Sequence, residues 1–345
     1  MLKLIVAAAA ALFATSGPEA PQAAGAPDAA AVGWTVEQRK DGRGQVQFTL
    51  SRQTATSQWI HSNDIDLADL PGFSPGQLAS ASGAPVSFRL QREAGALICQ
   101  GIARRGRGTG ECSFAADPAF VAGLQRRGIA APSETQMFSL ALAKIGLTYV
   151  DELERQRYAR PTVAELVRAG DHGASLDYLR EMGRLGYRAG TLAGLIRMRD
   201  HGVTARFAGE MAAIGARDLT PEKLIRLRDH GVSAEFAGEL ARLGYRDIPV
   251  DDLVRLRDHG VSAEFVRDLA SHGVRGLPTG TLVRLRDHGV SADFVGELRA
   301  LGYAMNPDEL IRLRDHGVSA DFVRRANASG GRWSADELVR LRNGG

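Results

Sequence analysis

The residues of this chain best suited to chemistry recur at a fixed step. The triplet Asp-His-Gly occurs six times, starting at Asp171, Asp200, Asp229, Asp258, Asp287 and Asp315, with intervals of 29, 29, 29, 29 and 28 residues. Asp and His are common metal ligands, but neighbouring residues on a helix point about 100° apart. Stacked helices lie about 8–10 Å apart, which is too far for successive histidines to share one tetrahedral ion. We therefore expect no metal and no cofactor, and expect each histidine to bond the last carbonyls of a helix.

Two ladders of arginine keep the same step. The first contains Arg197, Arg226, Arg255, Arg284, Arg312 and Arg340, and the second contains Arg199, Arg228, Arg257, Arg286, Arg314 and Arg342. An open arginine stripe would bind phosphate, lipopolysaccharide or nucleic acid. From residue 171 to the end, however, 26 Lys and Arg accompany 25 Asp and Glu. Because polyanion binding by counterion release needs unpaired positive charge, this balance favours ion pairs with the Asp ladder three residues further on, within or between repeats. Carboxylates of a protein partner are a further ligand for these arginines.

Catalytic signatures are missing from the sequence. It contains no His-Glu-x-x-His, Gly-x-Ser-x-Gly or Walker motif. Polar residues that recur at a fixed step are typical of contacts that hold a repeat protein together, whereas an active site is usually a single asymmetric cluster. His61 and His272 are the only histidines outside the Asp-His-Gly ladder. The formal net charge is +3 over 345 residues, whereas a dedicated nucleic-acid binder would be lopsidedly basic. We expect neither an enzyme nor a nucleic-acid partner.

The N-terminus has the pattern of a secretory signal. Lys3 precedes an apolar run, Leu4–Ala14, that is too short to span a bilayer. Small residues at Ala14 and Ser16 predict cleavage after Ser16, so we assign residues 1–16 to a signal peptide and 17–32 to an Ala/Pro-rich linker. An uncleaved apolar tail is the alternative. The mature protein is expected in the periplasm or outside the cell, and not to span a membrane.

Residues 33–116 have the pattern of a small antiparallel β domain. Alternating apolar residues and the Asp41-Gly42 turn signal predict a hairpin of Trp34–Arg39 with Gln45–Arg52. Val86, Phe88 and Leu90 alternate again, and two further strands are expected at residues 96–103 and 108–114. The stretch between residues 62 and 85 is predicted to be loop with one helical turn.

The only two cysteines flank the last predicted turn. If Arg105-Gly106 is a two-residue hairpin loop, counting outward places Cys99 opposite Cys112 at a non-hydrogen-bonded pair, where side chains approach most closely. Cysteines in an exported protein are expected to oxidise, so we predict a Cys99–Cys112 disulfide, with two buried thiols as the alternative. Gly106, Gly108 and Gly110 could also suggest a phosphate loop, but strand pattern on both sides favours a tight hairpin.

Residues 117–345 are predicted to form an α-solenoid of 29-residue, two-helix repeats. In the clearest copy, Thr220 caps the first helix, Gly231 ends it in the left-handed conformation, and Ser233 caps the second. Capping boxes are expected at Thr162 with Glu165 and at Ser334 with Glu337. The repeat's structural positions are the aromatics Phe207, Phe236, Phe265, Phe294 and Phe322 and the glycines Gly202, Gly231, Gly260, Gly289 and Gly317. The last copy stops after one helix and is expected to act as a cap.

The region from about Val86 onward resembles the extracytoplasmic C-terminal region of bacterial antirepressor-type membrane metallopeptidases, the β-lactam-sensor class. The likeness rests on Arg92-Glu93-Ala94-Gly95, the glycine-rich hairpin from Gly106 to Gly110, and the Leu-Arg-x-His-Gly-Val-Ser type of repeat from Leu195 onward. The peptidase domain, its membrane helices and its zinc motif are not present in this chain. The resemblance therefore implies a shared module and carries over no catalytic residue.

Together these patterns predict an α+β protein with a small N-terminal antiparallel β domain followed by an α-solenoid. We expect a non-enzymatic exported scaffold that engages a protein or cell-envelope partner through its repeat surface. A ligand-sensing or regulatory module is the main alternative, and an unrecognised hydrolase is a further one.

Overall fold

The computed structural model describes residues 32–39, 45–53, 58–215 and 219–344. The chain forms two compact parts. The first, called the β domain below, comprises Met1–Leu90 and Leu97–Phe114, and the second, called the array, comprises Gln91–Ala96 and Ala115–Gly345. The predicted signal peptide and most of the predicted linker lie outside the described residues. Val32, which we had placed in the linker, already belongs to the first strand.

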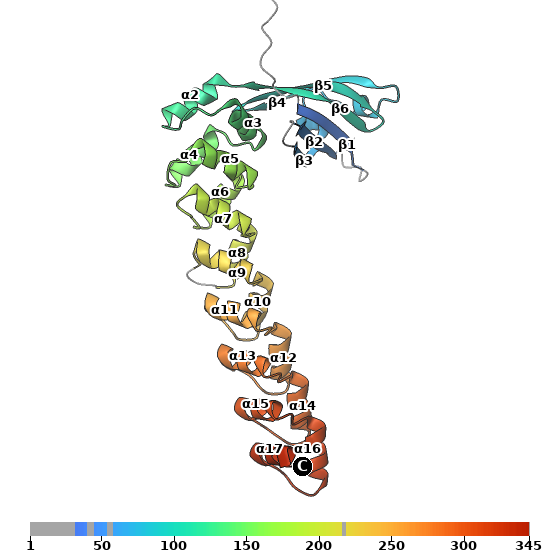
Figure 1. Cartoon of the computed structure of the whole chain (residues 1–345), viewed down its shortest axis with the longest axis vertical. Helices are drawn as coiled ribbons and strands as arrows, with labels where there is room; N and C mark the ends of the chain where they lie inside the picture. The colour runs from blue at the N-terminus through green and yellow to red at the C-terminus, as the bar shows by residue number, and fades with distance from the viewer. Residues whose placement is uncertain (1–31, 40–44, 54–57, 216–218, 345) are drawn as a thin grey trace, which may run out of the picture. The chain divides into compact units, whose positions relative to one another are not determined.

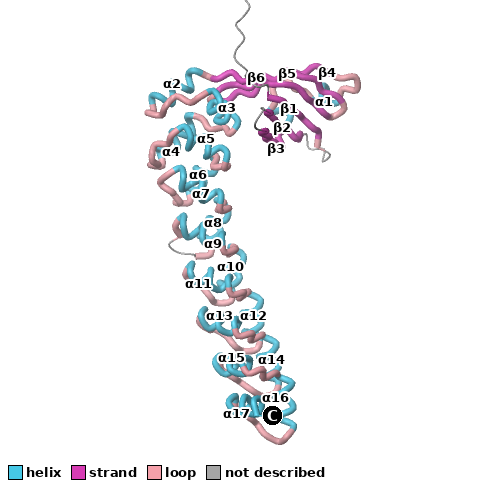
Figure 2. Tube along the Cα trace, viewed as in Figure 1, coloured by secondary structure: helices cyan, strands magenta, loops and turns pink. Residues whose placement is uncertain are grey.

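The β domain is built on one six-stranded antiparallel sheet (Figures 1 and 2). The strands are β1 (Val32–Gln38), β2 (Gln45–Gln53), β3 (Gln58–Asp66), β4 (Ala84–Arg92), β5 (Gly95–Arg104) and β6 (Arg107–Ala116), in the spatial order β3-β2-β1-β6-β5-β4. The expected hairpin of the first two strands is confirmed, with Val36 opposite Phe48. Its predicted Asp41-Gly42 turn lies outside the described residues.

The loop predicted between residues 62 and 85 is wrong in part, because strand β3 extends to Asp66. The expected helical turn is confirmed as the five-residue helix α1 (Pro75–Ala79), and a short 3₁₀ turn lies at Leu67–Asp69. Strand β3 escaped detection because its second half is polar and lacks alternation. It is held instead by pairing along β2, where the Ser62 hydroxyl lies 2.9 Å from the Thr49 hydroxyl.

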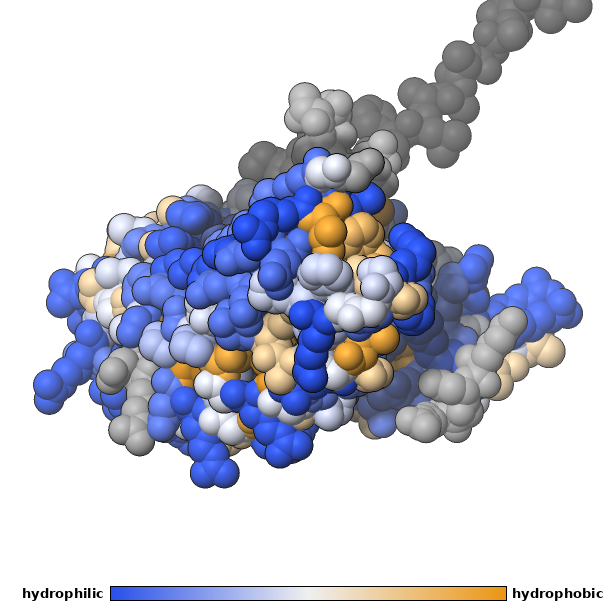
Figure 3. Space-filling model, turned by 90° about the horizontal axis from the view of Figure 1, so that it is seen from below, coloured by the Kyte–Doolittle hydropathy of each residue, from blue (hydrophilic) through white to orange (hydrophobic). Residues whose placement is uncertain are grey.

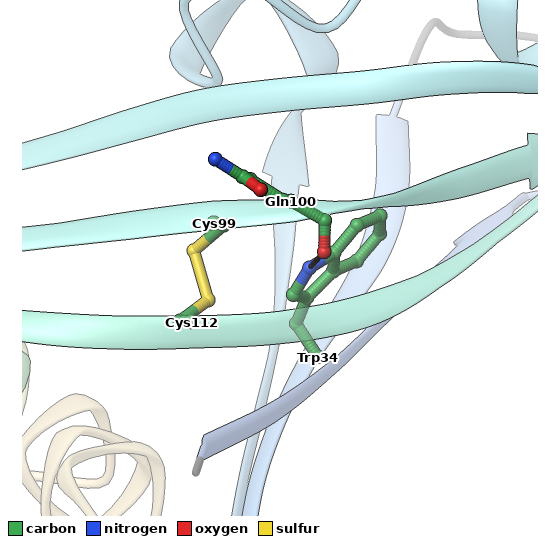
Figure 4. The surroundings of a disulfide bond; sticks show 4 residues. All are labelled: Trp34, Cys99, Gln100 and Cys112. Carbon is green, nitrogen blue, oxygen red and sulfur yellow. Dashed lines mark hydrogen bonds between the residues drawn. A yellow bond between two sulfur atoms is a disulfide. The ribbon is translucent and has the colours of Figure 1, made fainter. Parts of the chain in front are cut away.

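The core of the β domain is organised around Trp34, which is 1% exposed. Its indole Nε1 donates a 3.1 Å hydrogen bond to the Gln100 carbonyl (Figure 4). Its ring meets Phe88 edge-on, with 5.0 Å between the ring centroids. Glycines make room for this ring, because a Cβ at Gly101 would lie 2.7 Å from Trp34 Cζ2 and one at Gly108 would lie 2.9 Å from Cζ3. The glycines of this hairpin therefore allow β5 and β6 to pack closely against the Trp34 ring.

The predicted disulfide is confirmed. Arg105 and Gly106 form the two-residue turn, with φ of 50° and 83°. A hairpin turn with two positive φ angles is favoured because it matches the right-handed twist of the strands. Cys99 and Cys112 are bonded across β5 and β6 with a Cα–Cα distance of 4.0 Å (Figure 4). Such a bridge stabilises the fold mainly by restricting the unfolded chain.

The array consists of short helices in two rows, and successive repeats stack on one another (Figure 1). The first-helix row contains α3 (Glu134–Leu142), α5 (Val163–Asp171), α7 (Leu192–Asp200), α9 (Pro221–Asp229), α11 (Val250–Asp258), α13 (Thr279–Asp287), α15 (Pro307–Asp315) and α17 (Ala335–Gly344). The second-helix row contains α2 (Pro118–Arg126), α4 (Leu147–Arg155), α6 (Leu176–Arg184), α8 (Ala205–Ala213), α10 (Ala234–Arg242), α12 (Ala263–Ser271), α14 (Ala292–Ala300) and α16 (Ala320–Ala328). Each helix packs against the next member of its own row, as a solenoid requires.

The predicted helix signals are confirmed in the repeat α9–α10. The Thr220 hydroxyl accepts the backbone N–H of Lys223, and the Ser233 hydroxyl accepts that of Phe236. Gly231 has φ of 66°, which only glycine adopts cheaply. The capping boxes at Thr162 and Ser334 are also present.

The apolar stripes of the repeats are buried as expected. Leu224, Leu227 and Leu240 have no exposed surface, and Phe236 is 7% exposed. Phe207, Phe265 and Phe294 are likewise buried. Phe322 is only half-buried, and among the described helices α17 alone follows its helix α16. No helix among the described residues is both long and apolar enough to cross a membrane.

One helix start depends on a residue far away in sequence. Gly146 precedes α4 without a side-chain cap of its own. The carboxylate of Glu93 takes that role, accepting the Leu147 N–H at 2.8 Å and the Thr148 hydroxyl at 2.9 Å. Glu93 belongs to the Arg-Glu-Ala-Gly turn between β4 and β5, so this turn serves the first repeats of the array.

The close packing of the β5–β6 hairpin predicts that one added methyl group will destabilise the β domain. Gly110→Ala should lower the free energy of unfolding of the β domain by about 1–3 kcal/mol, because the new Cβ would lie 2.0 Å from the Gln100 carbonyl oxygen. The measurement is urea unfolding followed by tryptophan fluorescence. The control is Gly76→Ala in α1, where nothing lies within 4 Å and stability should hold or rise. Equal stability of the two variants would contradict the packing described for this hairpin.

Candidate functional site

The Asp-His-Gly triplets link each repeat to the next. The histidine Nδ1 meets the aspartate Oδ1 of the following repeat in five pairs: His172–Asp200 at 2.6 Å, His201–Asp229 at 2.6 Å, His230–Asp258 at 2.9 Å, His259–Asp287 at 2.8 Å and His288–Asp315 at 2.7 Å. A carboxylate can only accept, so Nδ1 carries the proton. His316 ends the series, with its Nδ1 3.3 Å from the Asn343 amide nitrogen.

This arrangement corrects the expected role of the histidines. Each is the C-cap residue of its helix, and its backbone N–H bonds the carbonyl four residues earlier, as His230 does with Arg226. Instead of the expected bond to the last carbonyls of its own helix, the histidine ring bonds a residue of the next repeat. Carboxylate-oriented histidines also occur beside metals. Within the described part of the chain, no group of three or more His, Cys, Asp or Glu is placed to hold one.

Three of the six arginines of the first ladder form ion pairs, but not with the aspartates three residues further on. Their partners are aspartates in the first turn of the following repeat, in the pairs Arg226–Asp251, Arg284–Asp308 and Arg312–Asp336. The aspartate that we had expected to pair is already bonded to histidine. Arg197, Arg255 and Arg340 have no ion-pair partner among the residues that the structure describes. For Arg255 the reason is visible in the sequence, because Gly280 stands where the three pairing repeats have Asp251, Asp308 and Asp336.

The second arginine ladder lies over the aromatic rings of the preceding repeat. The guanidinium carbon is 5.1–5.7 Å from the ring centroid in the stacks Arg199–Tyr178, Arg228–Phe207, Arg257–Phe236, Arg286–Phe265, Arg314–Phe294 and Arg342–Phe322. These are cation–π contacts. The sequence analysis missed them, although the constant offset of 20 or 21 residues between arginine and aromatic was available as a signal.

Two contacts thus join every pair of neighbouring repeats in this part of the array, and we call them the inter-repeat clamp. For the repeats α7–α8 and α9–α10 the clamp consists of His201 with Asp229 and Arg228 over Phe207. The His201, Asp229 and Arg228 side chains are exposed and the Phe207 ring is buried, and the charge of the arginine is balanced by that of the aspartate. The candidate ladder is therefore largely an element of the architecture. Figure 3 views the molecule from the C-terminal end of the array. Hydrophilic residues cover most of the visible face.

The two histidines outside the ladder have separate roles. His272 ends α12, and its ring lies on Gly296, where a Cβ would come within 2.4 Å of it. Leu185 and Ile214 occupy the equivalent place in other repeats, so His272 replaces an apolar residue. His61 lies in β3 and its Nε2 is 2.6 Å from the Asn63 amide nitrogen.

A groove of about 810 Å³ lies between α8 and α10 on the second-helix row. Its polar lining includes Arg206, Glu210, Glu235 and Arg242, all exposed. Gly238 lies in the lining, and a Cβ there would meet only Ile214, at an ordinary 3.7 Å. A glycine inside a helix costs about 1 kcal/mol relative to alanine. Packing does not demand this glycine, and its effect is to keep the groove open.

Comparisons with known proteins supply no identity for the chain. No protein-family model matches the sequence, and no curated protein matches it.

The clamp predicts different effects for two arginines of the same helix. Arg257→Ala removes the guanidinium over Phe236 and should lower the free energy of unfolding of the array by about 1 kcal/mol. Arg255→Ala, two residues earlier, removes an exposed arginine with no ion pair within the described structure, and its effect should stay within about 0.5 kcal/mol. Urea titration followed by far-UV circular dichroism measures both. If Arg255→Ala destabilises as much as Arg257→Ala, the stacks do not hold the repeats together.

Proposed function

We propose that the protein is a non-enzymatic exported scaffold that binds a protein or cell-envelope partner through the second-helix row of its array. The observation that carries this proposal is the α8–α10 groove. The clamp residues Arg228 and Phe207 form part of its lining, and four further exposed charged residues, Arg206, Glu210, Glu235 and Arg242, lie outside the clamp. An interior glycine, Gly238, that packing does not require keeps the groove open. Arg206 and Glu210 pair within α8 at 2.7 Å and present both signs of charge, which suits a polypeptide surface.

The use of the recurring polar residues supports a binding role over catalysis. Asp, His and Arg are arranged in register along the array, and most of them serve contacts between repeats. Arrays of this kind commonly act through extended surfaces built from many repeats. The likeness to the extracytoplasmic region of antirepressor-type metallopeptidases is compatible with the same role.

Export is supported by the sequence of the N-terminus and by the disulfide. A bridge such as Cys99–Cys112 persists in oxidising compartments, which include the periplasm and the extracellular space. An exported array would meet proteins, lipids and glycans of the envelope rather than nucleic acid. The near-balance of charge in the array also disfavours a polyanion partner.

The proposal predicts that filling the groove abolishes partner binding without unfolding the chain. Gly238→Leu should project a side chain into the groove, and helix propensity should rise. The immobilised full-length protein is exposed to envelope extract, and retained proteins, lipids and glycans are identified and quantified. We expect one reproducible partner whose yield falls at least about tenfold with Gly238→Leu, the equivalent of about 1.4 kcal/mol.

The matched control is Gly280→Leu on the first-helix row, where nothing lies within 4 Å of the new Cβ. This variant should retain the partner at the wild-type level. Retention of the same partner by both variants would exclude the groove as the binding surface. A co-purifying lipid or glycan that both variants retain would favour the ligand-sensing alternative.

A further inference from the structure

The first repeats of the array contain a second cavity, of about 590 Å³, separate from the α8–α10 groove. It is formed by the end of α2, by α4 and by the segment that follows α4. Val150, Leu153, Tyr158 and Pro161 provide its apolar walls. The volume is within the range of about 300–1,000 Å³ that is typical of small-molecule sites.

The charged lining of this cavity is unbalanced. It contains three arginines, Arg126, Arg127 and Arg160, and one acid, Glu154. Arg127 is already committed, because its Nε and Nη2 bond both carboxylate oxygens of Asp151 at 2.6 and 2.9 Å. Its Nη1 donates to the Gly123 carbonyl at 3.0 Å. The Arg127 hydrogen bond holds the pKa of Asp151 below its usual range, so this pair stays ionised.

The other two arginines have no such partners. Neither Arg126 nor Arg160 forms an ion pair with any residue in the described ranges, and both are exposed. The Arg160 guanidinium lies beside Gly128 at the end of α2, where a Cβ would approach its Nη1 to 2.8 Å. Gly128, with φ of 73°, therefore leaves space for a cation at the edge of the cavity. This contrasts with the arginines of the second ladder, which are stacked on aromatic rings.

We propose that this cavity binds a phosphate monoester that carries an apolar group. Arg126 and Arg160 together with Glu154 leave the lining with a net positive charge, which favours an anion, and a phosphate monoester of about −1.5 to −2 charge at neutral pH can engage both guanidinium groups. Guanidinium groups bind phosphate oxygens through paired N–H donors. The apolar walls from α4 and from Tyr158 and Pro161 receive the organic part of the ligand.

Calorimetric titration of the full-length protein with phenyl phosphate tests this site. We expect one saturable site with Kd of about 1 mM or tighter. Arg126→Gln and Arg160→Gln should each weaken binding about tenfold, because each removes a charge-assisted contact. Inorganic phosphate, which lacks the apolar group, should bind about tenfold more weakly, and benzoate should also bind more weakly than phenyl phosphate.

The matched control is Arg184→Gln, which changes an exposed arginine of α6 outside the cavity. It should leave the affinity within about twofold of wild type. Circular dichroism spectra of all variants verify the fold. No saturable binding of phenyl phosphate, or equal losses in Arg160→Gln and Arg184→Gln, would overturn the site. Benzoate that binds as tightly as phenyl phosphate would overturn its assignment to phosphate.

Discussion

Helices of nine residues do not persist alone in water, and nearly every helix of the array has that length. Each must therefore be stabilised by the next repeat. Burial of apolar residues such as Leu227 and Phe236 provides the main stabilisation, and the inter-repeat clamp orients successive repeats through a hydrogen bond and a cation–π stack. Asp, His and Arg therefore recur about every 29 residues because each repeat must be joined to the next.

This requirement separates the surface into two kinds of residue. Those of the clamp are engaged by their neighbours and are largely charge-neutral as a set. The proposed recognition sites are the α8–α10 groove, which shares Arg228 with the clamp, and the cavity of the first repeats, where Arg126 and Arg160 form no ion pair with another described residue. Function in such an array is expected where a repeat departs from the common pattern, as with Arg160, or where packing does not determine the residue, as with Gly238.

Much of the architecture could be predicted from the sequence because local signals agree with the fold. The helix caps at Thr220 and Ser233, the left-handed Gly231 and the Cys99–Cys112 register follow from short-range geometry. Partners across repeats could not be predicted in this way. Nothing within one repeat indicates that His230 bonds Asp258 rather than a carbonyl, or that Glu93 caps α4. Strand β3 was missed because backbone pairing, not an apolar pattern, holds its polar half.

The central claim is that repeats are coupled to their nearest neighbours. Hydrogen exchange of Phe236→Ala, followed repeat by repeat, tests it directly. Removing this buried ring should cost about 3–5 kcal/mol, and protection should fall first in α9–α10 and in the two adjoining repeats. The helices that contain Phe120 and Phe322 should keep wild-type protection. Equal loss of protection in those distant helices would show one cooperative globule and would contradict the account.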